Sequence, residues 1–333
     1  MRPAPAWPVP ASPLPSSESG PMSHTSLAPS DPASTRAPGP GAAPGPDPRA
    51  LAERHGLTVS GARPPLPEYL RLLWHRRHFI AAFATARLTA TYATAKLGQL
   101  WQVVTPLLNA GVYYLIFGLL IGTRKHVPDF IPFLVTGVFI FTFTQNSVLT
   151  GTRAISGNLG LVRALHFPRA CLPVSICLAQ LQQLLFSIGV LMLILLGCGQ
   201  LPTWSWLLVV PALALQFVFN TGLAMIMARL GSRTPDLAQL MPFLTRTWMY
   251  ASGVMFSIDV VLKGKDVPGF VAALLHANPA AVYIDLVRFA LIDSFTSRQL
   301  PPHIWAFAAG WALLAGVTGF VYFWKAEERY GRG

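Results

Sequence analysis

Long stretches without a charged residue are the feature that most constrains this fold. Residues 170–228 form one run of 59 residues without Asp, Glu, Lys or Arg, and residues 97–123, 130–152 and 299–324 are also uncharged. A helix needs about 20 apolar residues to cross the roughly 30 Å core of a bilayer. The whole chain is 53% hydrophobic and only 11% charged, against roughly 25% charged in soluble domains. We therefore predict an all-α polytopic membrane protein.

Six membrane spans account for these runs. The run at 170–228 holds two spans, because the Gly- and Pro-containing segment 199–203 interrupts it. A fifth run, 237–258, contains a single charge, Arg246. The predicted spans are residues 102–122, 131–150, 174–197, 205–228, 237–258 and 303–324.

The basic residues between the spans predict the orientation. With the N-terminus inside, the inner segments carry thirteen Lys and Arg and the outer segments carry six. Positively charged loops stay on the cytoplasmic side. We expect a multi-pass protein of the cytoplasmic membrane with both termini in the cytoplasm. The net charge of +12 is spread over these loops, which argues against a nucleic-acid partner.

Two segments do not fit a simple count of spans. Residues 68–96 predict an interfacial amphipathic helix, with Leu72, Phe79 and Phe83 on an apolar face and basic side chains between 71 and 78. Between spans five and six, residues 268–292 contain two apolar stretches too short to cross, separated by Asn278 and Pro279. Such stretches are typical of a re-entrant segment.

The first 67 residues differ in composition from the rest. They contain 17 of the 30 prolines, mixed with Ala, Gly and Ser. Such a segment buries too little apolar surface to offset the entropy of ordering. We predict a disordered Pro-rich tail at 1–67, followed by a membrane domain at 68–333.

Arg246 is the one charge inside a predicted span. The apolar residues of span five favour insertion by roughly 2 to 4 kcal/mol, whereas a central Arg costs roughly 2.5 to 3.5 kcal/mol. Arg246 is therefore expected to face protein or water.

The inner loop 151–168 contains the pattern of a short amphipathic helix. Ile155, Leu159, Val162 and His166 recur at helical spacing, and Arg153 and Arg163 lie beside them. Such a helix rests on the membrane or docks into a groove on a cytoplasmic partner.

The sequence contains no convincing catalytic or metal-binding constellation. Residues 264–266 lack the glycine spacing and the following Ser or Thr of a nucleotide-binding loop. The cysteines have no zinc-binding spacing, and His75 and His78 flank two arginines, which would repel a cation. We therefore expect no metal site and no enzyme activity in this chain.

Five short motifs, in this order along the chain, resemble those of a known protein family. They are YATAKLGQLW at 92–101 followed by Thr105-Pro106-Leu107, HFPR at 166–169 with LPVS at 172–175, PDL at 235–237, Asn278-Pro279 with Tyr283, Ile284 and Arg288, and EERYGR at 327–332. Together they resemble the ABC-2 type permeases that export O-antigen, teichoic acid, galactan and similar polysaccharides, over about residues 66–333.

This resemblance implies half of a transporter. Two copies of the chain would pair with two copies of a separate ABC ATPase, which docks on the 151–168 helix. The coupling residues would be Arg153, Ile155, Leu159, Val162, Arg163 and His166. ATP and Mg²⁺ would belong to the ATPase, so this chain needs no cofactor. The substrate would be a glycan on an undecaprenyl-type lipid in the surrounding membrane.

Aromatic rings stack on the C–H faces of sugars and offer a path for such a glycan. The candidates are Tyr113, Tyr114, Phe117, Phe139, Phe143 and Tyr250. The outer segment with Asn278, Pro279, Tyr283 and Arg288 would cap the exit.

Two other functions remain open from the sequence. One is an ABC-2 exporter of small hydrophobic drugs, which would need a wide apolar cavity. The other is a polytopic lipid-glycan enzyme, which would need Asp259, Asp266, Asp285 and Asp293 to converge.

Overall fold

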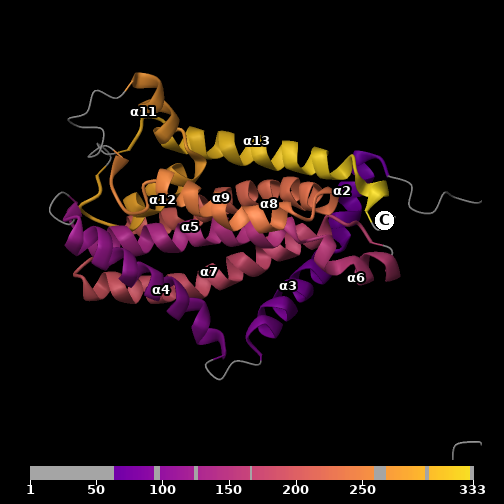
Figure 1. Cartoon of the computed structure of the whole chain (residues 1–333), viewed down its shortest axis with the longest axis horizontal. Coiled ribbons are helices and arrows are strands. Elements are labelled where there is room, and N and C mark those ends of the chain that lie inside the picture. Colours follow the sequence, from indigo (N-terminus) through magenta and orange to yellow (C-terminus); the bar gives the residue numbers. More distant parts are fainter. Residues whose placement is uncertain are drawn as a thin grey trace, which may run out of the picture. The chain divides into compact units, whose positions relative to one another are not determined.

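The computed structural model describes residues 64–93, 98–123, 127–165, 167–258, 268–296 and 300–330. Every regular element in these ranges is a helix. The predicted tail at 1–67 lies almost wholly outside the described residues, as does His166. Figure 1 shows the long helices running alongside one another, with α11 at one end and α2 and α6 at the other.

Five helical segments are long and apolar enough to cross a membrane, and they match predicted spans one to four and six. α4 (Trp101–Tyr113) continues as the π-helix η2 (Tyr114–Leu120), and the 3-10 helix η5 (Trp204–Leu208) leads into α8. The other segments are α5 (Phe130–Thr152), α7 (Cys171–Gly197), α8 (Val209–Arg233) and α13 (Ile304–Trp324).

The fifth predicted span is shorter than expected. α9 covers Leu237–Ala251, which is 15 residues and about 22 Å at 1.5 Å per residue. The chain then turns at Gly253, whose φ is +63°, a left-handed conformation that favours glycine. Residues 237–258 therefore do not form one continuous span, because hydropathy alone does not register this turn.

The segment between α9 and α13 is a bent helix pair. α11 (Gly269–His276) and α12 (Pro279–Leu291) meet at an angle of 63°. The bend falls at the predicted place, because the Asn278 side chain caps α12 by accepting a hydrogen bond from the Ala280 amide at 3.1 Å.

The helix predicted at 68–96 is instead two helices. α2 (Leu66–His75) and α3 (Arg77–Tyr92) are separated by Arg76, whose backbone leaves the helical region at φ −88° and ψ 10°. Tyr69 on α2 is buried, while α3 packs on α7. The apolar pattern did not predict the break at Arg76, which lets α2 bury Tyr69 while α3 packs on a different helix.

Small residues let the backbones of α5, α8 and α13 approach closely. A Cβ atom added to Gly222 would collide with the Ala315 carbonyl, and one added to Gly231 would collide with the Thr152 carbonyl. Close approach of this kind is typical of small-residue packing in membrane bundles. α8 therefore lies directly against both α5 and α13.

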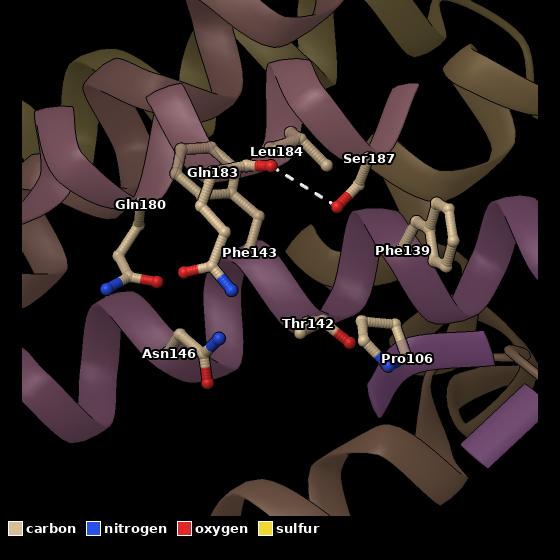
Figure 2. Close-up of a pocket in the computed structure, with 9 residues that line it drawn as sticks. All are labelled: Pro106, Phe139, Thr142, Phe143, Asn146, Gln180, Gln183, Leu184 and Ser187. Atoms are coloured by element: carbon tan, nitrogen blue, oxygen red, sulfur yellow. Dashed lines mark hydrogen bonds between the residues drawn. The ribbon is translucent and has the colours of Figure 1, made fainter. Parts of the chain in front are cut away.

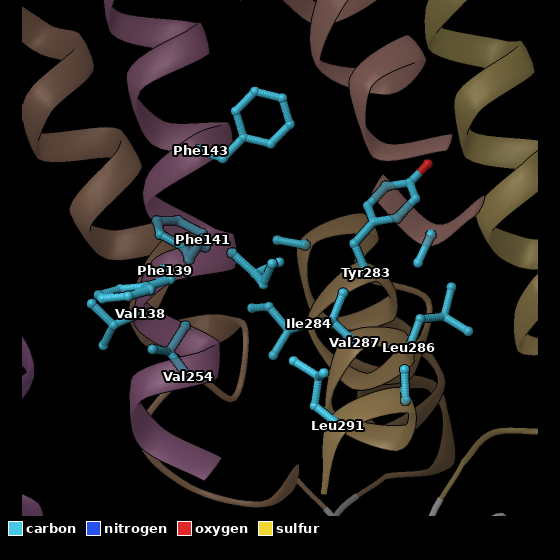
Figure 3. Close-up of a cluster of buried hydrophobic side chains, with 14 of the residues drawn as sticks. Val138, Phe139, Phe141, Phe143, Val254, Tyr283, Ile284, Leu286, Val287 and Leu291 are labelled. Carbon is cyan, nitrogen blue, oxygen red and sulfur yellow. The ribbon is translucent and has the colours of Figure 1, made fainter. Parts of the chain in front are cut away.

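α12 is enclosed by the bundle rather than placed on its surface. Branched side chains of α12, including Ile284, Val287 and Leu291, face Val138 and Phe141 of α5 (Figure 3). A segment that is too short to cross the membrane must be covered by protein or line an aqueous cavity. The burial of α12 meets this requirement.

Candidate functional site

The end of the bundle at which α5 begins is organised around Arg288. This side chain is 2% exposed, and its guanidinium donates to the carbonyls of Phe133, Gly253 and Val254 at 2.9 to 3.2 Å. It also forms an ion pair with Asp285 at 3.2 Å. Arg288 thus joins α12 to the start of α5 and to the turn after α9.

Asn278 makes a second junction between α12 and α9. Its Oδ1 accepts from Trp248 Nε1 at 2.8 Å, and its Nδ2 donates to the Ala251 carbonyl and to Ser252 Oγ at 3.1 Å each. Tyr283 donates to the Ala308 carbonyl of α13 at 2.9 Å. The residues predicted for the outer segment therefore fix α12 against its neighbours, and Pro279 begins the helix.

One face of α9 has no partner within the described part of the chain. α9 packs on α5 and α8 through the buried residues Met241, Thr245 and Met249. On the other side, exposed large apolar residues gather at helical spacing: Leu240, Phe243, Leu244 and Tyr250. Arg246 is exposed as well, so the bundle itself does not cover this charge.

The predicted aromatic path falls into separate environments. Tyr250 lies on the exposed face of α9, whereas Tyr113, half-buried, points its hydroxyl at the Met249 sulfur at 3.9 Å. Tyr114 and Phe117 pack at the margin of the central cluster. Phe139 and Phe143 are buried at 1% and 3% exposure. The structure therefore does not bring the six aromatic residues together on one surface.

Phe139 and Phe143 instead border a pocket between α4, α5 and α7. Figure 2 shows its nine lining residues, which include five polar side chains that the sequence analysis did not single out: Thr142, Asn146, Gln180, Gln183 and Ser187. Their signal in the sequence is the presence of amides inside uncharged apolar runs, where polar groups are costly.

The loop 151–168, predicted to lie on the inner side, is partly buried against the bundle. Ile155 and Val162 are 1% and 5% exposed and belong to a cluster with residues of α7 and α13. Leu159, Arg153 and Arg163 are exposed. These residues do not lie on one continuous helix, because the 3-10 turn η4 (Ser156–Asn158) separates Ile155 from α6 (Leu159–Ala164). Ile155 and Val162 are covered by the bundle, and docking by this loop stays a prediction.

A buried hydrogen-bond cluster joins this end of the bundle. The Tyr69 hydroxyl donates to Glu327 Oε2 at 2.8 Å and accepts from the Ala170 amide at 3.1 Å. Glu327 Oε1 accepts from the Arg169 amide at 2.8 Å, and the Arg169 guanidinium donates to the Glu327 carbonyl. α2, the segment after α6 and the 3-10 helix η7 (Glu327–Arg329) therefore meet in one place.

Burial of this cluster changes its acid–base properties. Desolvation raises the pKa of the Glu327 carboxyl above its ordinary value, despite the hydrogen bonds from Arg169 and Tyr69. It also raises the pKa of the Tyr69 phenol. The sequence offered no clue to this cluster beyond the carboxylate in the motif at 327–332.

Enzyme-like and metal-binding arrangements are missing from the described residues. No group of three His, Cys, Asp or Glu in these ranges is placed to hold a metal ion. Of the four aspartates that an enzyme would need, Asp285 pairs with Arg288, and Asp259 and Asp266 lie outside the described residues.

The fold and these sites define a multi-span helical membrane protein with a short loop helix, α6, and an enclosed bent helix pair. Residues 79–292 match the model of the ABC-2 type transporter family. The chain belongs to this family.

Its curated relatives include named polysaccharide exporters. It is 27% identical over 192 residues to the O-antigen export system permease protein RfbA of Myxococcus xanthus, covering 58% of this chain and 73% of the relative. It is 28% identical over 175 residues to the protein of the same name from Klebsiella pneumoniae, covering 52% and 67%. The polysialic acid transport protein KpsM of Escherichia coli is 23% identical over 224 residues, covering 66% and 83%.

Proposed function

We propose that this chain is the permease subunit of an ABC transporter that exports a lipid-linked polysaccharide or another cell-envelope glycan across the cytoplasmic membrane. The observation that carries this proposal is the similarity to relatives named for O-antigen export and polysialic acid transport. The fold agrees, because its five long apolar segments suit a membrane conduit. The carrier lipid would be of the undecaprenyl type.

A separate ATPase would supply the energy and would bind the ATP and Mg²⁺. The inner loop suits a docking element because Ile155 and Val162 anchor it while Leu159, Arg153 and Arg163 stay exposed. A push on α6 would reach α2 and the segment after α13. The backbone amides of Arg169 and Ala170, which follow α6, donate hydrogen bonds to Glu327 and Tyr69, and Tyr69 in turn donates to Glu327. Such rigid connections transmit small shifts between elements.

The exposed face of α9 would form the contact between two copies. An uncovered charge such as Arg246 at membrane depth is costly unless it faces protein or water. Pairing two α9 faces around an aqueous path would meet this requirement and would place Tyr250 beside the glycan. The large apolar residues Phe243 and Leu244 would then contact the second copy.

The orientation would place α2, the inner loop and the end of α13 in the cytoplasm. The hydrogen bonds of Glu327 bring these segments to the same end of the bundle. The excess of Lys and Arg in the same segments favours the cytoplasmic side.

Depletion of the chain in its native cells tests the proposal. We expect lipid-linked glycan to accumulate in the inner leaflet while its synthesis continues, and surface glycan to fall. Unchanged surface glycan would contradict the proposal. Loss of drug resistance with normal surface glycan would favour a drug exporter instead.

Pairing through α9 has its own test. A Phe243→Cys variant of the ATPase-bound complex should form a disulfide-linked dimer on mild oxidation, because pairing of the two α9 faces would place Phe243 near the two-fold axis, where a residue lies close to its own copy. Gly310→Cys, on an open stretch of α13, is the matched control. Equal cross-linking of both variants would contradict the proposed interface.

A further inference from the structure

Polar side chains are buried where α5 and α8 pack against each other. Thr144, Ser147 and Asn220 are 0% exposed and Gln216 is 1% exposed. Gln216 Nε2 donates to the Ile140 carbonyl and to Thr144 Oγ1 at 3.0 Å each. Both helices are long and apolar enough to cross a membrane, where an unmatched polar group is costly. The remaining polar atoms of these side chains therefore need partners too.

The register of the two helices places Ser147 and Asn220 at the same level. Asn220 lies four residues after Gln216 and four residues before Ala224, which packs against Gly151. On α5, Ser147 lies between Gly151 and the threonine that Gln216 binds. Residues four apart share one face of a helix. Ser147 and Asn220 therefore meet at the interface of α5 and α8.

Four polar atoms at this level have no nitrogen or oxygen partner in the part of the chain that the structure describes. They are Ser147 Oγ, Gln216 Oε1, and Oδ1 and Nδ2 of Asn220, and all four are covered. The Cys177 thiol of α7 lies beside Ser147 and donates to the Asn220 carbonyl at 3.6 Å, but a thiol is a weak hydrogen-bonding group. Buried polar atoms in native proteins are rarely left without partners, so these atoms indicate a bound ligand.

The chemistry of the four atoms decides which ligand fits. The two carbonyl oxygens accept, the Asn220 nitrogen donates, and the Ser147 hydroxyl does both. An ion would have no counter-charge, because residues 130–152 and 170–228 contain no charged residue. Water both donates and accepts, and a buried water typically makes about three hydrogen bonds to otherwise unpaired groups. Water therefore matches the site.

We propose that α5 and α8 bind an ordered water molecule between them through Ser147, Gln216 and Asn220. Its O–H groups suit the carbonyl oxygens of Gln216 and Asn220, and its oxygen suits the donors of Ser147 and Asn220. The opposite face of α8 is dry and tightly packed, since a Cβ atom added to Gly222 would collide with the Ala315 carbonyl of α13. This water site does not depend on which substance the protein transports.

Radiolytic footprinting tests the site directly. An X-ray pulse produces hydroxyl radicals from bound water as well as from bulk water, and these radicals oxidise the side chains that they contact. The complex with its ATPase is irradiated in nanodiscs of phosphatidylethanolamine and phosphatidylglycerol. Free glutamine in the buffer scavenges the bulk radicals, and mass spectrometry locates the oxidised residues. Cys177 is the reporter, because it is 0% exposed and contacts Asn220.

We expect Cys177 to be oxidised despite its burial, and the oxidation to be lost in Asn220→Val and reduced in Ser147→Ala. Ser147→Ala removes a single oxygen atom, so it keeps the test decisive if the other variant does not fold. Ser187→Ala is the matched control, because this buried hydroxyl of α7 already donates to the Gln183 carbonyl at 3.2 Å, and it should leave the oxidation unchanged. An unmodified Cys177 in the wild type would overturn the proposal, as would oxidation that neither variant reduces.

Thermal unfolding gives a second readout. Ser147→Ala should lower the unfolding midpoint about as much as Ser187→Ala, by roughly 2 to 4 °C, because each change removes a hydroxyl that has a partner. Without a water, the Ser147 hydroxyl would be unpaired, and its removal would leave the midpoint unchanged or raise it. That result would overturn the water site yet leave the proposed function intact, because only depletion of the whole chain tests that function.

Discussion

Replacement of Arg288 by methionine should loosen the end of the bundle at which α5 begins. Methionine keeps the apolar stem but removes every hydrogen bond to the carbonyls of Phe133, Gly253 and Val254. Breaking a buried charged network costs about 3 to 5 kcal/mol, because the groups left behind have no other partner. The lysine variant should cost less, about 1 to 3 kcal/mol, since an ammonium retains three donors but lacks the planar fork of arginine.

Thermal unfolding of the detergent-solubilised chain measures this effect. A cost of 3 kcal/mol or more should lower the midpoint by roughly 6 °C or more for a domain of this size, with lysine between methionine and wild type. Arg233→Met, at an exposed position at the end of α8, should leave the midpoint unchanged. An Arg288→Met variant as stable as wild type would refute the view that Arg288 fixes α12.

Three further predictions concern Glu327, the loop 151–168 and the helix packing. Because burial raises the pKa of Glu327, the folded chain binds more protons than the unfolded chain between the ordinary and the raised values. Stability should therefore rise as pH falls through this window. Glu327→Gln should weaken this dependence of the unfolding midpoint on pH, and an unchanged dependence would contradict the reasoning. Leu159→Asp should preserve the folded chain but lower ATPase co-purification about ten-fold, whereas Val162→Asp should abolish folding because that residue is buried. Equal folding of both variants on size-exclusion chromatography would contradict the view that Val162 anchors the loop and Leu159 does not. Gly222→Ala should separate α8 from α13 and lower the unfolding midpoint by several degrees, since overpacking costs about 1 to 3 kcal/mol. In the control Gly310→Ala the added methyl group meets no atom within 4 Å, so the midpoint should not change. Equal midpoints of the two variants would show that the close approach of α8 and α13 is unimportant.

The sequence predicted the long apolar elements well because crossing a bilayer imposes length and hydropathy on them. Five of the six spans follow from uncharged runs alone. The bend at Asn278 was also predictable, since Asn-Pro is a local signal that needs no tertiary information. Local chemistry therefore determines most of the architecture.

Tertiary contacts explain what the sequence did not predict. The turn at Gly253 ends α9 early because Arg288, distant in the chain, binds the carbonyls there. Ile155 and Val162 matched an amphipathic pattern, but the pattern does not tell which partner covers an apolar face. The bond between Tyr69 and Glu327 spans 258 positions and has no periodic signal.

ATP-driven movement of lipid-linked glycan in a reconstituted system tests the central claim most directly. Proteoliposomes containing this chain and its ATPase, loaded with the native lipid-linked glycan, should transfer the glycan to the leaflet opposite the ATPase when ATP and Mg²⁺ are added to the ATPase side. Omitting the ATPase or the ATP should stop the transfer. Glycan transfer by the chain alone, or no transfer by the complete complex, would contradict the account.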